Sequence, residues 1–355
     1  MTISSDPLPS LNVLVTGGSG FLGSSIVAEL LTNDALVRPA KVRIIDLKPY
    51  QGVQDPRVEF VEGNICDPMT ISKTCQGIDL VIHAAAIVDW GTRLPQEVYH
   101  TNAEGTQLVI QACIDNGVSC LIYCSSLDTV ITGKPLRDID EDQPYPARHL
   151  NMYCQSKCIG EQLVMAANGS ALRTMVLRPS DIYGEGDPYH IPPLIKMAKS
   201  GFYIHIGDGR SKCQHVYVRN MAWAVVLGAR ALWDSHAPVA GRVYFITDGP
   251  GSNFLTFFDS IIEQAGYRIR PRNFWLPVWL AYGLGAIAEG IARILRPLHY
   301  YQPKLSRFAV KYISTDFTFT AERARRDFGY EPKYSHEEAF RNTVSYFSRT
   351  PLSPK

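Results

Sequence analysis

The sequence predicts an α/β protein with a doubly wound parallel sheet and a smaller C-terminal lobe. Short apolar runs rich in β-branched residues alternate with segments whose apolar residues have helical spacing, and this alternation is typical of βαβ units. Of the 355 residues, 46% are hydrophobic and 19% are charged, so the chain can bury a large core. After Pro179 the alternation gives way to the Gly- and Pro-rich sequence DIYGEGDPYHIPP, which indicates a crossing into the second lobe.

The first strand and helix lie on either side of a cluster of glycines. Residues 12–16 (NVLVT) form an apolar run that stops at this cluster, and residues 21–31 (FLGSSIVAELL) carry apolar side chains at helical spacing. The same reasoning predicts further strands at 42–46, 57–65, 80–86, 121–126, 174–179 and 243–247. It predicts further helices at 106–116, 152–167 and 322–328. Strands and helices in this order form one parallel sheet.

The glycine cluster TGGSGFLG, residues 16–23, has the spacing of a dinucleotide-binding turn. Its glycines fit G-x-G-x-x-G on Gly18, Gly20 and Gly23, or G-x-x-G-x-x-G on Gly17, Gly20 and Gly23. Such a turn lets the backbone approach a pyrophosphate, and the following helix directs its first amide groups toward the anion. The cluster follows a strand and opens a helix, which is the context that the motif requires.

Two acidic residues stand where such a cofactor needs them. Asp46 ends the second strand, and a carboxylate there accepts hydrogen bonds from the ribose hydroxyls and repels a 2′-phosphate. We therefore expect NAD rather than NADP, although Asp46 also fits an ordinary loop. Asp67 follows the third strand, where it either binds the adenine or serves as a turn residue before Pro68. The expected cofactor contacts are Gly17, Gly20, Phe21, Leu22, Gly23, Asp46, Ile65, Asp67, Ala84 and Ala85.

A second motif, Tyr153-Cys-Gln-Ser-Lys157, falls in the helix predicted at 152–167. The i, i+4 spacing places the phenol and the ammonium on one face of the helix. Tyrosine titrates near 10 in isolation, so a nearby cation is needed to make it an acid/base near neutral pH. Upstream, the strand at 121–126 ends in Ser125-Ser126, and one of these hydroxyls could hold a substrate oxygen. Together the motifs predict an alcohol–ketone oxidoreductase.

Composition excludes some other functions. The formal charge of +1 argues against a nucleic-acid partner, which calls for a basic patch or stripe. The eight cysteines contain no C-x-x-C pair, and we interpret them as reduced thiols in a cytosol-like compartment. Cys154 and Cys158 lie one helical turn apart without a histidine at ligand spacing, so we expect no metal.

Residues 274–295, FWLPVWLAYGLGAIAEGIARIL, contain only Glu289 and Arg293 as charged side chains. Our first expectation is a buried or substrate-covering helix. A helix in a membrane interface comes second, because Trp275, Trp279 and other aromatic residues suit that depth. A membrane span comes third, because Pro277, the glycines and the two charges disfavour it, although the segment is long enough at roughly 20 residues.

These residues resemble the extended short-chain dehydrogenase/reductase family, which has a Rossmann-type fold, and within it the 3β-hydroxysteroid dehydrogenases. The resemblance covers nearly the whole chain. The segments that carry it are HAAAIVDWG (83–91), TNAEGTQLVIQAC (101–113), YCQSKCIGEQLVMAANG (153–169), LRPSDIYGEGDP (177–188), VYVRNMAWA (216–224), YFITDG (244–249), LRPLHYYQP (295–303) and FTFTAERARRDFGYEP (317–332).

The resemblance implies a site and a reaction. Tyr153 would be the proton donor and acceptor, Lys157 would lower its pKa and hold the nicotinamide ribose, and Ser126 would be the catalytic hydroxyl. Asn102 would order the active site behind the cofactor. The implied reaction is oxidation of a 3β-hydroxyl on a hydrophobic sterol-like or terpenoid alcohol, with hydride transfer to NAD and, in some members, migration of a steroid double bond. Membrane association, at the endoplasmic reticulum in a eukaryote or otherwise a cytoplasmic location, and a homodimer are also expected.

The implied domains are an NAD-binding unit, 1–185 with return segments at about 213–250, and a substrate lobe. The lobe comprises 186–212 and 251–355, including 274–295. Arg219 departs from the family pattern; it either binds an anionic group or lies solvated at the surface.

Three other functions stay open. On the same scaffold the chain could be a nucleotide-sugar epimerase or dehydratase, against which the apolar 274–295 segment argues. It could be an NAD(P)H-dependent ketone reductase, against which Asp46 argues. It could also be a dinucleotide sensor without catalysis, against which the intact Tyr153, Lys157 and Ser126 argue.

Overall fold

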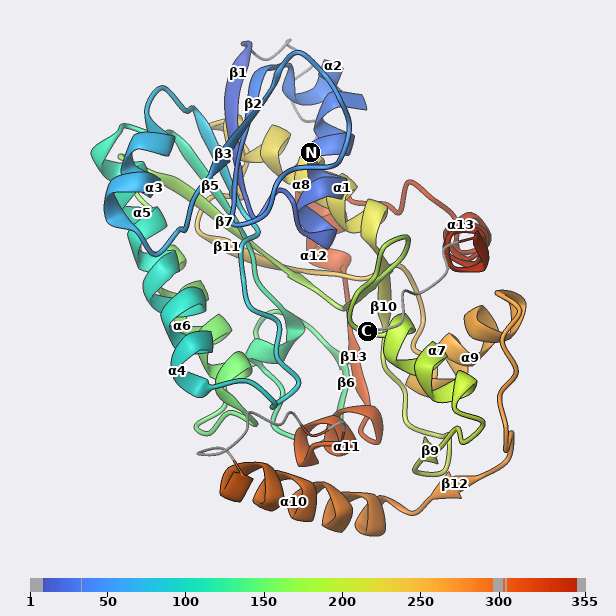
Figure 1. The fold of residues 1–355 in the computed structure, drawn as a ribbon. Coiled ribbons are helices and arrows are strands. Elements are labelled where there is room, and N and C mark those ends of the chain that lie inside the picture. Colours follow the sequence, from blue (N-terminus) through green and yellow to red (C-terminus); the bar gives the residue numbers. More distant parts are fainter. Residues whose placement is uncertain (1–8, 33, 296–302, 304, 350–355) are drawn as a thin grey trace.

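A parallel sheet of seven strands forms the centre of the molecule (Figure 1). The computed structural model describes residues 9–32, 34–295, 303 and 305–349. The strand order is β3-β2-β1-β4-β5-β7-β11. The strands are β1 (Leu11–Thr16), β2 (Pro39–Asp46), β3 (Val58–Glu62), β4 (Leu80–His83), β5 (Cys120–Cys124), β7 (Arg173–Pro179) and β11 (Arg242–Ile246). This confirms the predicted fold class.

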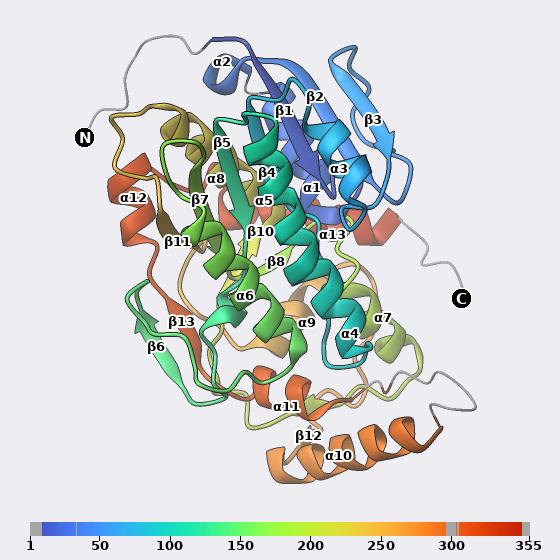
Figure 2. The same ribbon diagram turned by 90° about the vertical axis from the view of Figure 1, so that its left-hand side faces the viewer.

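Helices cover both faces of the sheet. Figure 2 shows α3 (Pro68–Cys75), α5 (Gly105–Asp115) and α6 (Met152–Ala166) in front of the strands. The opposite face carries α1 (Phe21–Thr32), α2 (Asp34–Val37), α8 (Val218–Trp233) and α12 (Glu322–Phe328) (Figure 1). Strands buried on both faces read as continuous apolar runs, and in β1 and β7 nearly every side chain is buried.

The order of the strands fixes where a ligand can bind. β1 pairs with β2 on one side and with β4 on the other. The strands β1 to β3 are therefore added toward one edge of the sheet, and β4 and the later strands toward the opposite edge. In open parallel sheets the crevice at such a reversal, beyond the carboxyl ends of the strands, is the binding site. The glycine turn after β1 and the small residues after β4 both lie at this edge.

A second group of elements lies beyond the carboxyl ends of the strands. Three short parallel pairs, β10-β8, β12-β9 and β13-β6, belong to it. Its strands are β6 (Leu136–Ile139), β8 (Asp181–Tyr183), β9 (His205–Ile206), β10 (His215–Tyr217), β12 (Trp275–Leu276) and β13 (Phe317–Phe319). Its helices are α7 (Ile191–Lys199), α9 (Phe254–Gln264), α10 (Val278–Leu295), α11 (Arg307–Ile313) and α13 (His336–Arg349). The helix α4 (Pro95–Tyr99) runs through a π-helical turn into α5 and packs on α6.

The C-terminal segment returns to the sheet. Ala321, Ala324, Phe328 and Tyr330 belong to the apolar core around β1, α1 and α8. The domain boundaries given above remain a prediction. Of the segment 295–303 that carried part of the resemblance, all but its two end residues lie outside the described residues.

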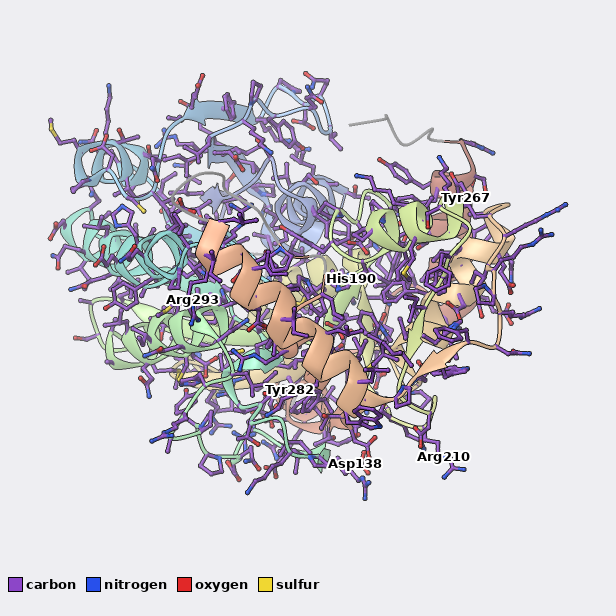
Figure 3. All side chains as sticks on the ribbon, turned by 60° about the horizontal axis from the view of Figure 1, so that its bottom comes forward. Asp138, His190, Arg210, Tyr267, Tyr282 and Arg293 are labelled. Carbon is purple, nitrogen blue, oxygen red and sulfur yellow. The ribbon has the colours of Figure 1, made fainter. Side chains whose placement is uncertain are left out.

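The apolar segment 274–295 forms an exposed helix, not a buried one. After Pro277 the helix α10 runs along the outside of the molecule, where it packs on α11, and Figure 3 shows it crossing the front with Tyr282 and Arg293 along it. Ala281 and Gly285 are its buried residues, and only 11% of the helix is buried. The expectation of a buried helix is therefore wrong, because the protein covers only the narrow face that carries these small residues.

Candidate active site

The glycine turn after β1 leaves no room for side chains. Gly17 has a φ of +70°, and a Cβ there would lie 2.7 Å from the Cα of Ala85. A Cβ on Gly23 would lie 2.0 Å from the carbonyl oxygen of Gly17. The turn is therefore packed against the residues that follow β4, and the backbone of both segments is open to a close-lying ligand. This geometry fits the pyrophosphate of a dinucleotide at the start of α1.

Asp46 and Asp67 differ in what they already bind. Asp46 ends β2, and its carboxylate accepts hydrogen bonds from the backbone amides of Ser19 at 3.1 Å and Lys48 at 3.1 Å. It thus faces the glycine turn, as a ribose-binding carboxylate must. Asp67 caps α3 by accepting from the amide of Met69 at 3.1 Å. Its turn role is thereby observed, whereas its contact with adenine stays a prediction.

Tyr153 and Lys157 lie one turn apart on α6 and are both buried. Asn151 caps this helix by accepting from the amide of Cys154 at 2.9 Å, and so fixes its first turn. The Lys157 ammonium donates to the carbonyl oxygen of Cys124 at 2.7 Å and lies 4.1 Å from the centre of the Tyr123 ring. Burial lowers the pKa of Lys157 to about 8.

The acidity of the Tyr153 phenol depends on its surroundings. Burial, followed by the charge of Asp128, raises the pKa of the phenol well above its ordinary value. The Lys157 ammonium donates to the Cys124 carbonyl oxygen, and its lowering of the phenol pKa stays a prediction.

The two serines after β5 have separate partners. Ser125 donates to the Glu161 carboxylate at 2.6 Å, and Glu161 pairs with the guanidinium of Arg178 in the protein interior. Ser126 donates to Asp128 at 2.7 Å. Ser126 and Tyr153 line the same cavity, and the Ser126 side chain acts to lower the pKa of the Tyr153 phenol. Ser126, the residue predicted from the resemblance, is therefore the serine next to Tyr153.

Asn102 lies behind these residues. It is 1% exposed, in a π-helical turn from His100 to Glu104. Its amide nitrogen donates to the carbonyl oxygen of Ile87 at 2.9 Å and to the Ser156 hydroxyl at 3.2 Å, and its oxygen accepts from the Ile87 amide at 2.7 Å. It thus ties the segment after β4 to α6, as an ordering residue should.

One cavity joins the cofactor turn to these side chains. It is lined by Phe21, Leu22 and Gly23 of the turn and by Ser126, Tyr153 and Lys157. Five aromatic side chains also line it: Trp90, Tyr189, His190, Phe308 and Tyr312. These five were not predicted as site residues, because they come from three separate segments of the chain. Trp90 lies in HAAAIVDWG, whereas nothing in the sequence marks Tyr312.

Ionisable side chains also line this wall, among them Asp128, Asp181 and His190. Burial raises the pKa of Asp128 to about 7 and that of Asp181 to about 6. Burial opposes the charged form of His190, but Asp187, 3.1 Å from it, and Asp181 outweigh this effect, and the pKa of His190 is raised. One oxygen of Asp128 and one of Asp181 have no hydrogen-bond partner. The cavity therefore combines aromatic walls with unsatisfied acceptors.

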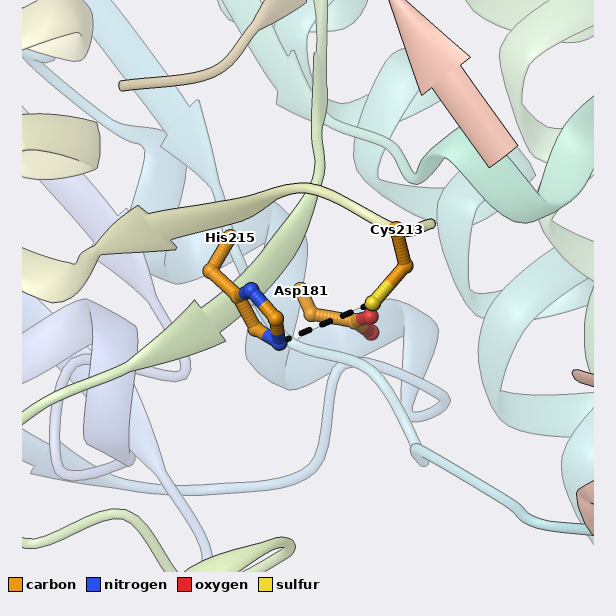
Figure 4. A group of neighbouring side chains, drawn as sticks. All are labelled: Asp181, Cys213 and His215. Atoms are coloured by element: carbon orange, nitrogen blue, oxygen red, sulfur yellow. Dashed lines mark hydrogen bonds between the residues drawn. The ribbon is translucent and has the colours of Figure 1, made fainter. Parts of the chain in front are cut away.

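Asp181 also neighbours Cys213 and His215 (Figure 4), and the ligand atoms of the three lie within 4.8 Å of one another. The Cys213 sulfur and the His215 Nε2 are 3.8 Å apart. The Cys213 thiol lies 3.5 Å from the Ser252 carbonyl oxygen as a donor, and Asp181 accepts from Tyr312 at 2.8 Å. These contacts account for the thiol and for one carboxylate oxygen without a metal.

Arg219 lies in α8, outside the set of residues that line the cavity. Its guanidinium bonds the Tyr334 hydroxyl, lies 3.6 Å from Glu29 and stacks over the Tyr334 ring at 4.2 Å. The residue thus ties α8 to α1 and to the segment before α13.

The glycine turn, the Tyr153–Lys157 pair and the adjoining cavity define an oxidoreductase of the short-chain dehydrogenase/reductase type. The chain belongs to the 3-beta hydroxysteroid dehydrogenase/isomerase family, whose model matches residues 14–278. It is 33% identical to the mouse 3 beta-hydroxysteroid dehydrogenase type 7, with 96% of each chain covered. It is 34% identical to the human type 7 enzyme, with 93% of this chain and 94% of that one covered.

A plant relative and solved structures complete the comparison. The 3beta-hydroxysteroid-dehydrogenase/decarboxylase isoform 2 of Arabidopsis thaliana is 33% identical over 94% of this chain and 62% of its own length. The dTDP-glucose 4,6-dehydratase of Streptomyces venezuelae, solved with NAD, is 21% identical and has a TM-score of 0.73, covering 96% of this chain and 97% of that one. The Thermotoga maritima UDP-glucose 4-epimerase is 23% identical, with a TM-score of 0.69 and coverage of 95% and 98%. These structures establish the shared fold.

Proposed function

We propose that this protein oxidises the 3β-hydroxyl of a hydrophobic steroid or sterol to the ketone and uses NAD as the hydride acceptor. The observation that carries the proposal is one cavity whose wall combines the glycine turn, Ser126 and Tyr153 with aromatic side chains such as Trp90 and Phe308. The 3β position of the hydroxyl rests on family membership.

Each residue has a distinct part in this proposal. NAD supplies the acceptor for the hydride; the glycine turn and Asp46 hold it, and Lys157 reaches its nicotinamide ribose. Ser126 and Tyr153 bind the reacting oxygen, and Tyr153 receives its proton. Asn102 fixes the segment after β4 against α6. The aromatic side chains of the cavity wall exclude water from an apolar substrate.

The test is NADH formation from NAD by detergent-solubilised protein with a panel of 3β-hydroxysteroids and their 3α-epimers. Turnover of the 3β series alone supports the proposal. The absence of turnover with every steroid of the panel, in protein that still binds NADH, contradicts it. Nucleotide sugars and secondary-metabolite ketones with NADPH are included, since their turnover would establish the alternative reactions on this scaffold.

We propose further that α10 rests on a membrane surface. Leu280, Leu284, Ile287, Ile291 and Ile294 are all exposed, and their spacing of three and four residues puts them on one face of the helix. Trp279 beside them is 74% exposed. A large exposed apolar patch marks an interaction site. Helices with one apolar face bind in the interface of a bilayer with that face toward the lipid.

Two other features favour a lipid partner. Phe202 and Phe274, both exposed, extend the apolar surface beyond α10 with ring centres 6.0 Å apart. Arg268, Arg270 and Arg272 are exposed in the segment that leads to it, where they can meet anionic headgroups. The compartment that this favours in a eukaryote is the endoplasmic reticulum. The homodimer stays a prediction.

Vesicle flotation tests the membrane contact. Wild-type protein should float with phosphatidylcholine–phosphatidylserine vesicles. Ile287→Asp combined with Ile291→Asp should reduce the floating fraction severalfold, because two charges are placed on the helix face that contacts the lipid. Met69→Asp on α3 is the control, since Met69 is also exposed, at 83%. Equal flotation of wild type and both variants contradicts the proposal.

A further inference from the structure

An ion pair is buried between α6 and β7, one helical turn beyond Lys157. The Glu161 carboxylate is fully buried and pairs with the guanidinium of Arg178, whose Nε lies 3.1 Å from each carboxylate oxygen. The same carboxylate accepts hydrogen bonds from the Ser125 hydroxyl at 2.6 Å and from the Tyr145 hydroxyl at 2.6 Å. Its two oxygens thus bind three side chains that come from three separate segments of the chain.

The segment that carries Ser126 is attached to α6 through the two residues before this serine. The carbonyl oxygen of Cys124 accepts from the Lys157 ammonium at 2.7 Å. The Ser125 hydroxyl donates to Glu161, one helical turn further along α6. Both bonds lead to the helix that also carries the phenol of the site. The end of β5 is therefore held at a fixed position against this helix.

A close approach of α6 to β5 supports this attachment. A Cβ on Gly160 would lie 2.7 Å from the Tyr123 hydroxyl and 3.0 Å from the Asn102 carbonyl oxygen, so the glycine lets the helix lie close to the strand. The Ser125 amide also donates to the carbonyl oxygen of Leu177 on β7 at 2.7 Å. The backbone of Ser125 is thus fixed to the sheet, while its side chain is fixed to the helix.

Stability gives little reason for an ion pair at this place. Burial removes both charges from water, and apolar residues of similar volume often stabilise a fold as well or better. The Nη1 atom of Arg178 is buried without a hydrogen-bond partner among the described residues. Glu161 and Arg178 also lie outside the set of residues that line the cavity, so neither is placed to touch a substrate there. The contact that leads from the pair to the cavity is the Ser125 hydroxyl.

We propose that Glu161 is a positioning residue for the oxidation of the alcohol. It acts through the Ser125 hydroxyl and so holds Ser126 in place, while Arg178 fixes the orientation of the Glu161 carboxylate. In the proposed function Ser126 and Tyr153 bind the reacting oxygen together. A displacement of one relative to the other should therefore slow the reaction more than it weakens binding. This inference rests on the proposed function and adds a residue that acts on its site from outside the cavity.

Two substitutions that remove equivalent hydrogen bonds test the proposal. Ser125→Ala and Tyr145→Phe each delete one hydroxyl that lies 2.6 Å from the Glu161 carboxylate, but only Ser125 belongs to the segment before Ser126. We expect Ser125→Ala to lower kcat for the steroid about 10- to 100-fold, because a misplacement of about 1 Å can have an effect of this size. Its KM and its NADH affinity should stay within about twofold of the wild type. Tyr145→Phe should keep all three quantities within about twofold.

A second comparison separates an effect through Glu161 from a direct contact, because Ser125 itself lines the cavity. Glu161→Leu combined with Arg178→Met removes the ion pair without leaving an unpaired charge. This double variant should lose kcat to the same extent as Ser125→Ala. Ser125→Ala added to it should lower kcat further by less than about twofold, because residues that act through one another are not additive.

The results distinguish this proposal from the proposed function. Thermal melting and NADH fluorescence establish that each variant is folded and binds cofactor. Equal kcat values in Ser125→Ala and Tyr145→Phe overturn the positioning role, and this comparison stands even if the double variant does not fold. A loss by the same factor from Ser125→Ala with and without the ion pair means that the serine acts directly, and this also overturns the role. If the wild type oxidises no steroid, the proposed function fails, and the same variants are compared with the nucleotide sugar or ketone of the panel that the protein does convert.

Discussion

At the scale of single residues, a substitution of Tyr153 distinguishes catalysis from cofactor binding. The Tyr153 phenol lines the cavity together with Ser126, whereas the glycine turn is the segment expected to hold the pyrophosphate of the cofactor. We expect Tyr153→Phe to reduce NADH formation about 10²–10⁴-fold, as the loss of a general acid/base does. NADH binding, measured by fluorescence, should stay within twofold or so of the wild type.

Tyr267→Phe is the control for the loss of a phenol. The Tyr267 hydroxyl makes only a long bond of 3.5 Å to the Phe347 carbonyl oxygen, and the residue does not line the cavity. Unchanged turnover in Tyr267→Phe and a large loss in Tyr153→Phe are expected. Turnover in Tyr153→Phe comparable to that of the control would remove the phenol from the reaction, as the sensor alternative requires.

Residues with a local pattern could be predicted from the sequence, and those brought together by tertiary folding could not. Tyr153 and Lys157 are one helical turn apart, so their spacing alone puts them on one face. Trp90, His190 and Tyr312 meet only because three separate segments converge on one cavity. The raised pKa of Tyr153 was also beyond the sequence, since it depends on burial and on the position of Asp128.

At the scale of elements, the glycine turn and α1 act as one unit. A Cβ at Gly23 would meet the Gly17 carbonyl oxygen, carbonyl carbon and the Gly18 Cα at 2.0 to 2.8 Å, so Gly23→Ala must open the turn. We expect NAD affinity to fall at least about tenfold, which is roughly 1.4 kcal/mol. Isothermal titration with NADH measures it.

Gly290→Ala on α10 is the matched control, because no atom lies within 4 Å of its added Cβ. Alanine favours helices by about 1 kcal/mol over glycine, so this variant should bind NADH normally and melt no lower than the wild type. Equal NADH affinity in the two variants would show that the turn is not packed against the cofactor site as described.

The helix α11 connects the cavity to the exposed helix α10. Ser306 caps α11 by accepting from the Ala309 amide at 3.1 Å, and its hydroxyl donates to the Trp90 carbonyl oxygen at 2.7 Å. Phe308 and Tyr312 of this helix line the cavity. Ser306→Ala should cost about 1 kcal/mol of unfolding free energy and raise the KM for steroid severalfold, as measured by chemical denaturation and steady-state kinetics.

Ser335→Ala distinguishes stability from binding. Ser335 accepts from the Glu338 amide at 3.3 Å at the start of α13, which contributes no residue to the cavity. It should lose stability without a change in KM. A KM in Ser306→Ala equal to that of Ser335→Ala would contradict the link between α11 and the substrate end.

At the scale of the whole molecule, the regular sheet could be predicted and the lobe could not. The helix predicted at 152–167 is α6 (Met152–Ala166), and the strand predicted at 174–179 is β7 (Arg173–Pro179); both have long, periodic or continuous apolar patterns. The strands of the lobe have only two to four residues each, which is too short to show a period in the sequence. The exposure of α10 was predicted wrongly for a different reason. An apolar helix has the same sequence pattern whether protein or lipid covers it.

The cavity also sets how the stability of the whole molecule depends on pH. The pKa of Asp181 is about 6 in the folded protein, against an ordinary value of 3.8. Because the folded value is the higher one, the folded state binds more protons between these two pH values. The contribution of Asp181 to stability is therefore fully present below pH 3.8 and is lost as pH rises through about 6.

Asp181→Asn should remove this dependence. An amide keeps an oxygen that can accept from Tyr312, and it carries no charge to bury. At alkaline pH the variant should be more stable than the wild type by about 1–3 kcal/mol, measured by urea denaturation, and the difference should vanish near pH 4. A variant less stable than the wild type at every pH would mean that the Asp181 charge is compensated in the fold. The expected result would instead make this carboxylate a case in which an active-site cavity retains a group at the expense of stability.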